Sequence, residues 1–315
     1  MGGAGLVGSH LALRLLDEGC RVTVIDIRTP RSIALLGEMQ RYPHFSYLRH
    51  DLTHPIHSPC DEIYNLTSSL SLRHHHLEAA TILRTEMLCA INALELARHN
   101  HARLLYASSG SIYNSLCGIT ATTLQPDREM ITTFAETKLA VEALHRAYIR
   151  QYDCDIRIMR IFNTYGTGAS LDDNRVVCSM IRRALSSDNI IIFGSGDQIR
   201  TFCWAGDVAE AMDRWMQMGR VECGTIALDI GGHYEISILQ LANLIVELTG
   251  SSSQVVHCDS RYHDYRRKVP DLMLAHRLLG WLPSMPLSDG LTLTINDMRH
   301  RMQAQARQLS WIDIQ

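Results

Sequence analysis

The chain has 315 residues, of which 46% are hydrophobic and 20% are charged, and its formal net charge is -3. This length fits one large α/β unit or two domains, and the composition is typical of a globular protein with a sizeable core. We expect no membrane partner, because no run of about 18 apolar residues is present. The near-neutral charge provides no basic field, so we expect no nucleic-acid partner.

The cysteines and histidines indicate neither disulfides nor a metal site. The nine cysteines are scattered and no C-x-x-C motif occurs, which favours the reduced thiols of a cytoplasmic protein over a disulfide framework. The triplet His74 to His76 is internal. Adjacent side chains on a helix point in different directions, so we expect a solvated segment there and predict no metal.

Strand-like and helix-like segments alternate along the first half of the chain. The predicted strands are 21–26, 45–49, 62–65, 103–108, 156–161 and 225–230, and the predicted helices include 8–18, 77–99 and 134–152. Such alternation is typical of a parallel sheet with helices on both faces. After Asn163 the segments become shorter and glycine-rich, which predicts a smaller second lobe interleaved with the first.

Three glycines at the start of the chain predict a dinucleotide site. The motif Gly2-x-x-Gly5-x-x-Gly8 opens a predicted helix, where backbone N–H groups can approach a pyrophosphate. The next predicted strand ends in Asp26, 18 residues after Gly8. An acid there accepts ribose hydroxyls and disfavours a 2′-phosphate, which favours NAD. Arg28 leaves NADP as an alternative, and a sheet that kept its loop without its ligand is another.

This glycine fingerprint usually follows a strand, and no strand precedes Gly2 here. That strand would be the central strand of the sheet. Truncation of the chain, replacement by another segment, and a true start further upstream remain three open explanations. The expected fold is α/β, a Rossmann-like doubly wound parallel sheet with a smaller C-terminal substrate lobe and the first strand missing.

From the glycine loop onward the chain resembles the extended short-chain dehydrogenase/reductases, which include nucleotide-sugar epimerases, dehydratases and decarboxylases. Segments 2–11 and 50–52 look like the cofactor loop and the segment near adenine in that family. Within the family the resemblance is strongest to UDP-glucuronate decarboxylases, through the runs 161–166, 173–177, 193–202 and 270–281. These runs keep their order over nearly the whole chain.

The resemblance implies two lobes, each with its own ligand. A dinucleotide-binding domain would comprise 1–163 with parts of 205–232, and a nucleotide-sugar lobe would comprise 164–204 and 233–315. The residues implied for NAD are Gly2, Gly5, Leu6, Val7, Gly8, Asp26, Asp51, Leu52, Leu66, Thr67 and Lys138. Those implied for a UDP-sugar are Asn163, Arg175, Val176, Phe193, Arg200 and Lys268. Arginine suits a diphosphate because its planar fork donates two hydrogen bonds, although surface solvation is the alternative for each arginine.

The catalytic motif of the family is incomplete in this chain. The family uses a Tyr and a Lys four residues apart on one helix face, so that the Lys lowers the phenol pKa and the phenolate takes a proton from a sugar hydroxyl. Here Lys138 is present but Phe134 stands at the Tyr position. Ser109 stands at the Ser/Thr position and Ser111 at the position of the decarboxylase Glu.

Two further residues bear on this motif. Glu86 occupies a place where the family tends to have Asn, and an acid there would repel a sugar carboxylate if it faced the site. The catalytic set predicted by the resemblance is Ser109, Ser111, Phe134, Lys138 and Arg200.

The predicted function is an NAD-dependent nucleotide-sugar enzyme resembling UDP-glucuronate decarboxylase, which oxidises C4, releases CO2 and reduces the product. The alternatives are an impaired binding relative and an epimerase or dehydratase. Phe134 has three open interpretations: an engineered change, a divergent enzyme with another base such as Tyr113 or Lys138, or a binding protein with little turnover. By resemblance, helices 77–99 and 134–152 would form a homodimer interface.

Overall fold

The computed structural model describes residues 1–68, 79–113, 129–220, 226–259 and 266–312. The histidine triplet at 74–76 therefore lies outside the described residues. Among the described helices, none combines the length and the apolar character needed to cross a membrane. Within the same ranges, no three His, Cys, Asp or Glu side chains gather in a way that could hold a metal ion.

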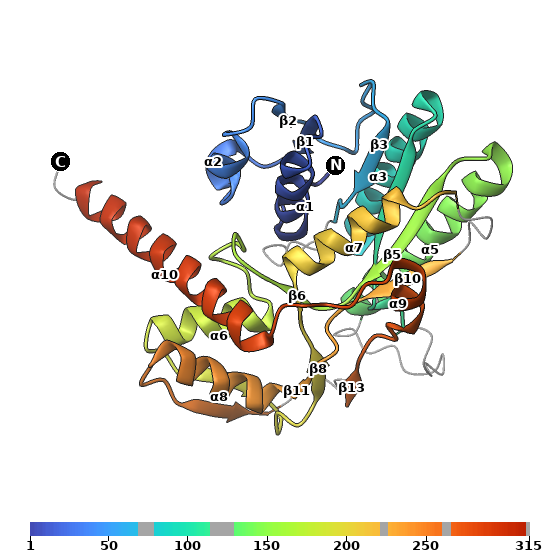
Figure 1. Cartoon of the computed structure of the whole chain (residues 1–315). Coiled ribbons are helices and arrows are strands. Elements are labelled where there is room, and N and C mark those ends of the chain that lie inside the picture. The colour runs from blue at the N-terminus through green and yellow to red at the C-terminus, as the bar shows by residue number, and fades with distance from the viewer. Residues whose placement is uncertain (69–78, 114–128, 221–225, 260–265, 313–315) are drawn as a thin grey trace.

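The larger part of the molecule is built around six described parallel strands, which form two sheets (Figure 1). One sheet pairs β1 (Val22–Asp26) with β2 (Phe45–Arg49). The other has the order β10-β5-β4-β3, formed by β3 (Glu62–Asn65), β4 (Arg103–Ser109), β5 (Ile156–Ile161) and β10 (Ala227–Ile230). The strands predicted at 45–49, 62–65 and 156–161 have these same bounds, and the other predicted strands differ by one or two residues.

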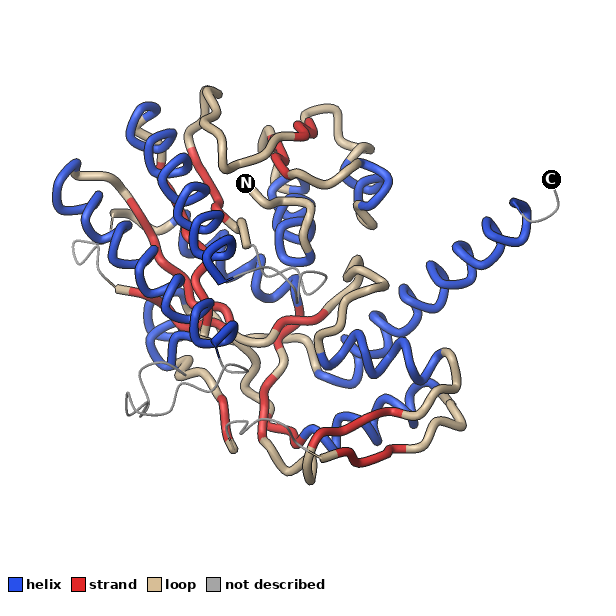
Figure 2. Tube along the Cα trace, turned by 180° about the vertical axis from the view of Figure 1, so that it is seen from behind, coloured by secondary structure: helices blue, strands red, loops and turns tan. Residues whose placement is uncertain are grey.

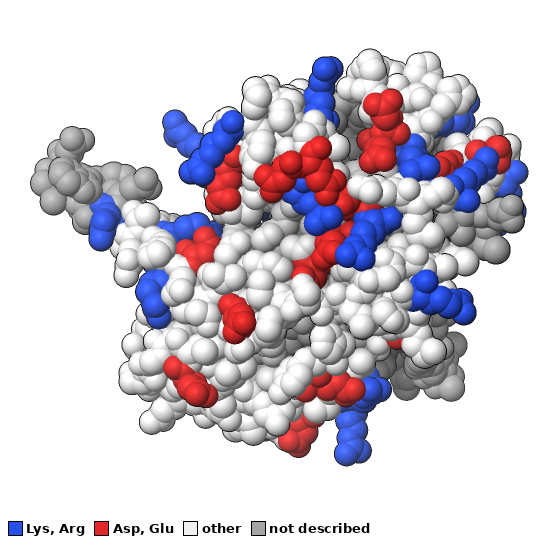
Figure 3. Space-filling model, in the orientation of Figure 1, with Lys and Arg blue, Asp and Glu red and all other residues white. Residues whose placement is uncertain are grey.

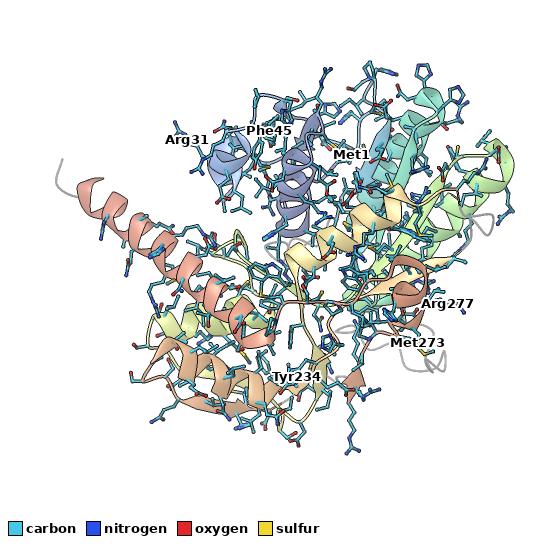
Figure 4. All side chains as sticks on the ribbon, in the orientation of Figure 1. Met1, Arg31, Phe45, Tyr234, Met273 and Arg277 are labelled. Carbon is cyan, nitrogen blue, oxygen red and sulfur yellow. The ribbon has the colours of Figure 1, made fainter. Side chains whose placement is uncertain are left out.

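Residues 1 and 2 lie between the two sheets and bond to both. The Gly2 N–H donates to the Ile25 carbonyl (2.8 Å), and the Leu66 N–H donates to the Met1 carbonyl (3.0 Å). The Met1 amino group donates to the Tyr64 carbonyl (2.9 Å), and Figure 4 shows Met1 beside these strands. The resulting order β2-β1-(1–2)-β3-β4-β5-β10 is that of a doubly wound sheet, so the predicted Rossmann-like fold is confirmed.

Helices cover both faces of this sheet because successive side chains of β4 point to opposite sides. Leu104 and Tyr106 pack in one core with α3 (Ala79–Asn100) and α5 (Glu129–Tyr152). Leu105 packs in another core with α1 (Leu6–Asp17) and α7 (Ala205–Gln217). Figure 2 shows α3 and α5 side by side on their face of the sheet.

A further core lies among helices of the second half of the chain. The helices α6 (Val176–Leu185), α8 (Ile238–Thr249) and α10 (Leu287–Ile312) pack around β7 (Ile190–Phe193). The remaining elements are η1 (Pro30–Ser32), α2 (Leu36–Met39), β6 (Thr164–Tyr165), β8 (Ile199–Thr201), β9 (Cys203–Trp204), β11 (Glu235–Ser237), β12 (Val255–Cys258), β13 (Arg267–Lys268) and α9 (Met273–Leu279). The division into two domains at the predicted boundaries stays a prediction.

One contact joins the first helix to a loop of the second half of the chain, and two caps set the ends of α8. His10 of α1 contacts the Thr167 carbonyl through Nε2 (3.0 Å), which ties the first helix to the loop after β6. Helix α8 begins at a capping box of Ser237 and Gln240 and ends at Gly250, whose φ is +64°.

On the face drawn in Figure 3, basic and acidic side chains are interspersed.

Candidate functional site

The glycine loop has a shape that only glycine permits. A Cβ on Gly2, whose φ is +69°, would lie 2.8 Å from the backbone of Leu66 and Thr67 at the end of β3. A Cβ on Gly8 would lie 2.6 Å from the Gly3 Cα. Helix α1 follows without a side-chain cap at Gly5, so its first N–H groups, including those of Leu6 and Val7, have the arrangement that suits a phosphate.

Asp26 is bonded to this loop and lies at the carboxyl end of β1. One carboxylate oxygen accepts the Ala4 N–H (3.0 Å) and the other accepts the Arg28 N–H (3.1 Å). Each oxygen has a second lone pair that can accept a ribose hydroxyl. The Arg28 guanidinium donates to the Ala4 carbonyl (3.1 Å), so this side chain is also held at the loop. The structure thus brings together the predicted loop and its acid.

The residues predicted near adenine and at the end of β3 differ in environment. The exposed Asp51 accepts the N–H and the hydroxyl of Thr53, and these hydrogen bonds lower the pKa of its carboxyl. Leu52 is buried against Ile25, so it can serve the site only by its backbone or by packing. Thr67 follows β3, where its N–H and hydroxyl both donate to the Asn65 side chain.

Phe134 and Lys138 share one face of α5, as their spacing predicts. The Lys138 ammonium lies 5.6 Å from the centre of the Phe134 ring and donates to the Ala107 carbonyl (3.3 Å). It also donates to the Glu86 carboxylate of α3 (3.0 Å), and both side chains are buried. Burial alone would lower the pKa of Lys138, but Glu86 outweighs it and raises that pKa. Glu86 therefore faces the lysine as its counter-ion.

The two serines after β4 are linked to the other half of the chain. The Ser109 hydroxyl donates to the Ser111 hydroxyl (3.1 Å) and accepts the Ser111 N–H (3.1 Å). The Lys268 ammonium of β13 donates to the Ser111 hydroxyl (3.4 Å). The turn between the serines requires glycine, since a Cβ on Gly110 would lie 2.7 Å from the Phe162 ring. Predicted catalytic and sugar-binding residues thus meet here.

Three predicted sugar-binding residues gather around β8. Arg200 is 8% exposed, and it lies opposite Lys268 in the pairing of β8 with β13. The Asn163 amide donates to the Thr201 carbonyl (3.2 Å). The other three lie at the start of α6 and the end of β7. Val176 is the first residue of α6, Arg175 precedes it and is paired with Asp173 (2.5 Å), and Phe193 is 61% exposed at the end of β7.

A buried polar network behind β4 was missed by the sequence analysis. The Glu142 carboxylate is fully buried and accepts hydrogen bonds from Ser108 (2.7 Å) and Arg160 (2.8 and 2.9 Å). Burial would raise the pKa of Glu142, but these donors outweigh it and lower that pKa. The available signal was a charged residue four positions after Lys138, on the same helix face.

The same network holds Tyr113, one of the two predicted alternative bases. Its hydroxyl accepts from Arg160 (2.9 Å) and donates to Asp229 (2.9 Å). Burial and the Asp229 carboxylate raise the pKa of Tyr113, which makes it a poor base near neutral pH. Burial also raises the pKa of Asp229, to about 6.

Comparisons with known proteins identify relatives over nearly the whole chain. The model of the NAD dependent epimerase/dehydratase family matches residues 1–231. UDP-glucuronic acid decarboxylase 1 of Xenopus tropicalis is 31% identical over 315 residues, which covers 97% of this chain and 72% of the relative. UDP-glucuronic acid decarboxylase 4 of Arabidopsis thaliana is 31% identical over 312 residues, with 98% and 69% covered.

Solved structures share the fold. The UDP-glucose 4-epimerase of Thermotoga maritima, determined with UDP-glucose, has a TM-score of 0.79 at 23% identity, with 96% of this chain and 98% of that chain covered. The UDP-glucuronic acid 4-epimerase of Bacillus cereus, determined with UDP-glucuronic acid and NAD, has a TM-score of 0.80 at 22% identity, with 95% and 98% covered. The predicted resemblance is confirmed, and the chain belongs to the NAD dependent epimerase/dehydratase family.

Proposed function

We propose that this chain is an NAD-dependent nucleotide-sugar enzyme that acts on UDP-glucuronate. The proposal is carried by the placement of the predicted residues at one edge of the sheet. Asp26 ends β1 and is bonded to the glycine loop, and Ser109 ends β4. Lys138 reaches this edge from α5, where it bonds to the Ala107 carbonyl of β4. Ligands of doubly wound sheets bind at that edge. The decarboxylase relatives supply the substrate class.

The residues present fit NAD. The loop leaves no room for a Cβ at Gly2 or Gly8, so its backbone can approach a pyrophosphate, and the Asp26 carboxylate can accept ribose hydroxyls. Lys138 and the backbone of Leu66 and Thr67 would complete the site. When bound, NAD accepts a hydride from the carbon that bears a sugar hydroxyl. A diphosphate would meet Arg200 and Lys268, which are neighbours on paired strands.

The sugar hydroxyl must also lose a proton, and Phe134 has no group that can accept it. Ser109 can hold the sugar oxygen, since its hydroxyl already bonds to Ser111 and, through it, to Lys268. Oxidation at C4 of glucuronate gives a β-keto acid, which loses CO2 readily, and a returned hydride completes a lyase reaction. The chain would be a divergent lyase whose proton acceptor differs from the family tyrosine.

A second candidate function is a binding protein that retains both ligands with little turnover. Phe134, Ser111 at the decarboxylase Glu position, and Glu86 bound to Lys138 favour it. An epimerase is the other outcome of the same first oxidation, if the carboxylate is kept and the hydride returns to the opposite face.

One experiment separates these functions. Titration calorimetry measures binding of NAD and UDP-glucuronate, and liquid chromatography with mass spectrometry of the mixture separates UDP-pentose, an isomer of UDP-glucuronate and unchanged substrate. Asp26→Ala is the matched variant and should weaken NAD binding. A pentose product supports the lyase, an isomerised hexuronate supports the epimerase, and binding without conversion supports the binding protein. Failure to bind either ligand contradicts all three.

We also infer a homodimer and a cytoplasmic location. Helices α3 and α5 pack together and carry exposed apolar residues, Leu83 (47% exposed) and Ile91 (36%) on α3 and Tyr152 (45%) on α5. Burial of such a face by a second copy would remove apolar surface from water. Light scattering should give twice the mass of one chain, and Ile91→Glu should shift it toward the monomer.

A further inference from the structure

Lys138 and Glu86 form an ion pair that lies away from solvent. The ammonium and carboxylate are 3.0 Å apart, and their side chains are 3% and 2% exposed. The pair connects α5 to α3, and it lies 5.6 Å from the Phe134 ring when measured from the ammonium to the ring centre. An uncompensated ammonium charge in this position would lower the pKa of any hydroxyl placed at residue 134.

The other side chains around the ammonium include no second carboxylate that bonds to it among the described residues, and the neighbouring Tyr106 acts in the same direction as Glu86 by raising the pKa of Lys138. The Tyr106 ring of β4 lies 5.0 Å from it and is stacked on His145 of α5. Burial lowers the pKa of His145 to about 4 and raises the pKa values of Tyr106 and of Cys89 on α3. All three side chains are therefore neutral near pH 7.

The other buried carboxylate nearby is balanced elsewhere. Glu142 lies one turn after Lys138 on α5, but its oxygens are bonded to Arg160 and Arg146 (2.7 to 2.9 Å). Glu86 is the carboxylate that bonds to the Lys138 ammonium directly. Among the described residues, the arginines therefore balance Glu142, and Glu86 lies against the lysine.

We propose that Glu86 is a positioning residue that holds the Lys138 ammonium and cancels its charge, so that the site cannot promote ionisation of a hydroxyl at residue 134. The inference rests on the proposed function only in placing Lys138 at the oxidation site. Loss of the tyrosine oxygen and neutralisation of the lysine are then two linked changes. Restoring the tyrosine alone would not restore a base.

The size of the effect follows from the distances. An opposite charge within about 4 to 6 Å lowers the pKa of an acidic group by about 1 to 3 units, and a nearby carboxylate counteracts that shift. With Glu86 in place, a tyrosine at residue 134 should therefore keep a pKa near or above the ordinary value of about 10. With Glu86 replaced by an uncharged isostere, that pKa should fall by at least about one unit.

The test is a phenol titration that needs no substrate. Protein labelled with 13Cζ-tyrosine is titrated by NMR, and the resonance of residue 134 is identified by its absence from the parent chain. We compare Phe134→Tyr with Phe134→Tyr/Glu86→Gln. Glutamine keeps an oxygen that accepts from Lys138. The matched control is Phe134→Tyr/Glu95→Gln, because Glu95 lies on the same helix but is paired with Arg98 at the surface.

We expect a tenfold or greater rise in the ionised fraction at fixed pH for the Glu86→Gln double variant, and no change for the Glu95→Gln control. Equal titration of all three variants would overturn the proposal. If the Glu86→Gln variant does not fold, Phe134→Tyr alone still tests the proposal, because it adds only one oxygen. A phenol pKa at residue 134 more than about one unit below 10 would then contradict charge cancellation by Glu86. In the Phe134→Tyr/Glu86→Gln variant, a lowered phenol pKa without conversion of UDP-glucuronate would count against the proposed function and leave this inference intact.

Discussion

Removing Lys138 should destabilise the protein because it leaves a buried carboxylate without its partner. In Lys138→Met the carboxylate of Glu86 keeps its desolvation cost and loses an ammonium 3.0 Å away. The lost attraction is about 5.5 kcal/mol at an effective dielectric constant of about 20. Breaking one partner of a buried pair typically costs about 3 to 5 kcal/mol after relaxation, so we expect a loss of that size.

The matched double variant Lys138→Met/Glu86→Leu isolates the charge. Apolar residues of similar volume can replace a buried ion pair at little net cost, so the double variant should recover at least about 2 kcal/mol relative to Lys138→Met. With an unfolding entropy of about 2.1 cal/mol/K per residue, a loss of 3 to 5 kcal/mol lowers the Tm by roughly 5 to 8 °C for a chain of 315 residues.

Thermal unfolding of the parent, Lys138→Met and the double variant measures these losses. A single variant as stable as the parent, or a double variant no better than the single, would refute the pairing.

Three further predictions concern other parts of the chain. Gly8→Ala should weaken NAD binding by about 5- to 150-fold, since crowding of this kind costs about 1 to 3 kcal/mol. The control Gly37→Ala has open space around its Cβ, so calorimetry compares the two, and equal affinities would contradict the loop geometry. Asp229 has a folded pKa of about 6, above the usual 3.8, so its contribution to stability should decline as pH rises from 4 to 6, and denaturation of Asp229→Asn should lack this dependence. Glu142→Ala should cost about 3 to 5 kcal/mol because Arg160 then lacks its buried partner, and a loss below 1 kcal/mol by urea denaturation would argue against the network.

Much of the fold could be predicted because the spacing of apolar residues along the sequence follows which side chains are buried. The strand 156–161 has apolar residues at four of its six positions and is buried over its first four residues, and its bounds were predicted correctly. The glycine loop could be predicted because close contacts leave no room for a Cβ at Gly2 or Gly8. The short strands β6, β9 and β13 carry no periodic signal, since each has two residues.

The pairing of side chains could not be predicted from spacing. Glu86 and Lys138 are 52 positions apart and meet only because α3 packs against α5. Glu86 alone suggested repulsion of a sugar carboxylate, whereas the structure shows a carboxylate bonded to an ammonium. Likewise, Ser111 and Lys268 are 157 positions apart, and only the tertiary fold brings them within 3.4 Å.

The most direct test of the proposed function is a single mixture of purified protein, NAD and UDP-glucuronate, followed by absorbance of reduced nicotinamide and by liquid chromatography with mass spectrometry. The account predicts a transient or sustained reduced signal and conversion of the UDP-sugar, both weakened by Asp26→Ala. Binding of both ligands with no reduced signal and no converted sugar would contradict an oxidising enzyme.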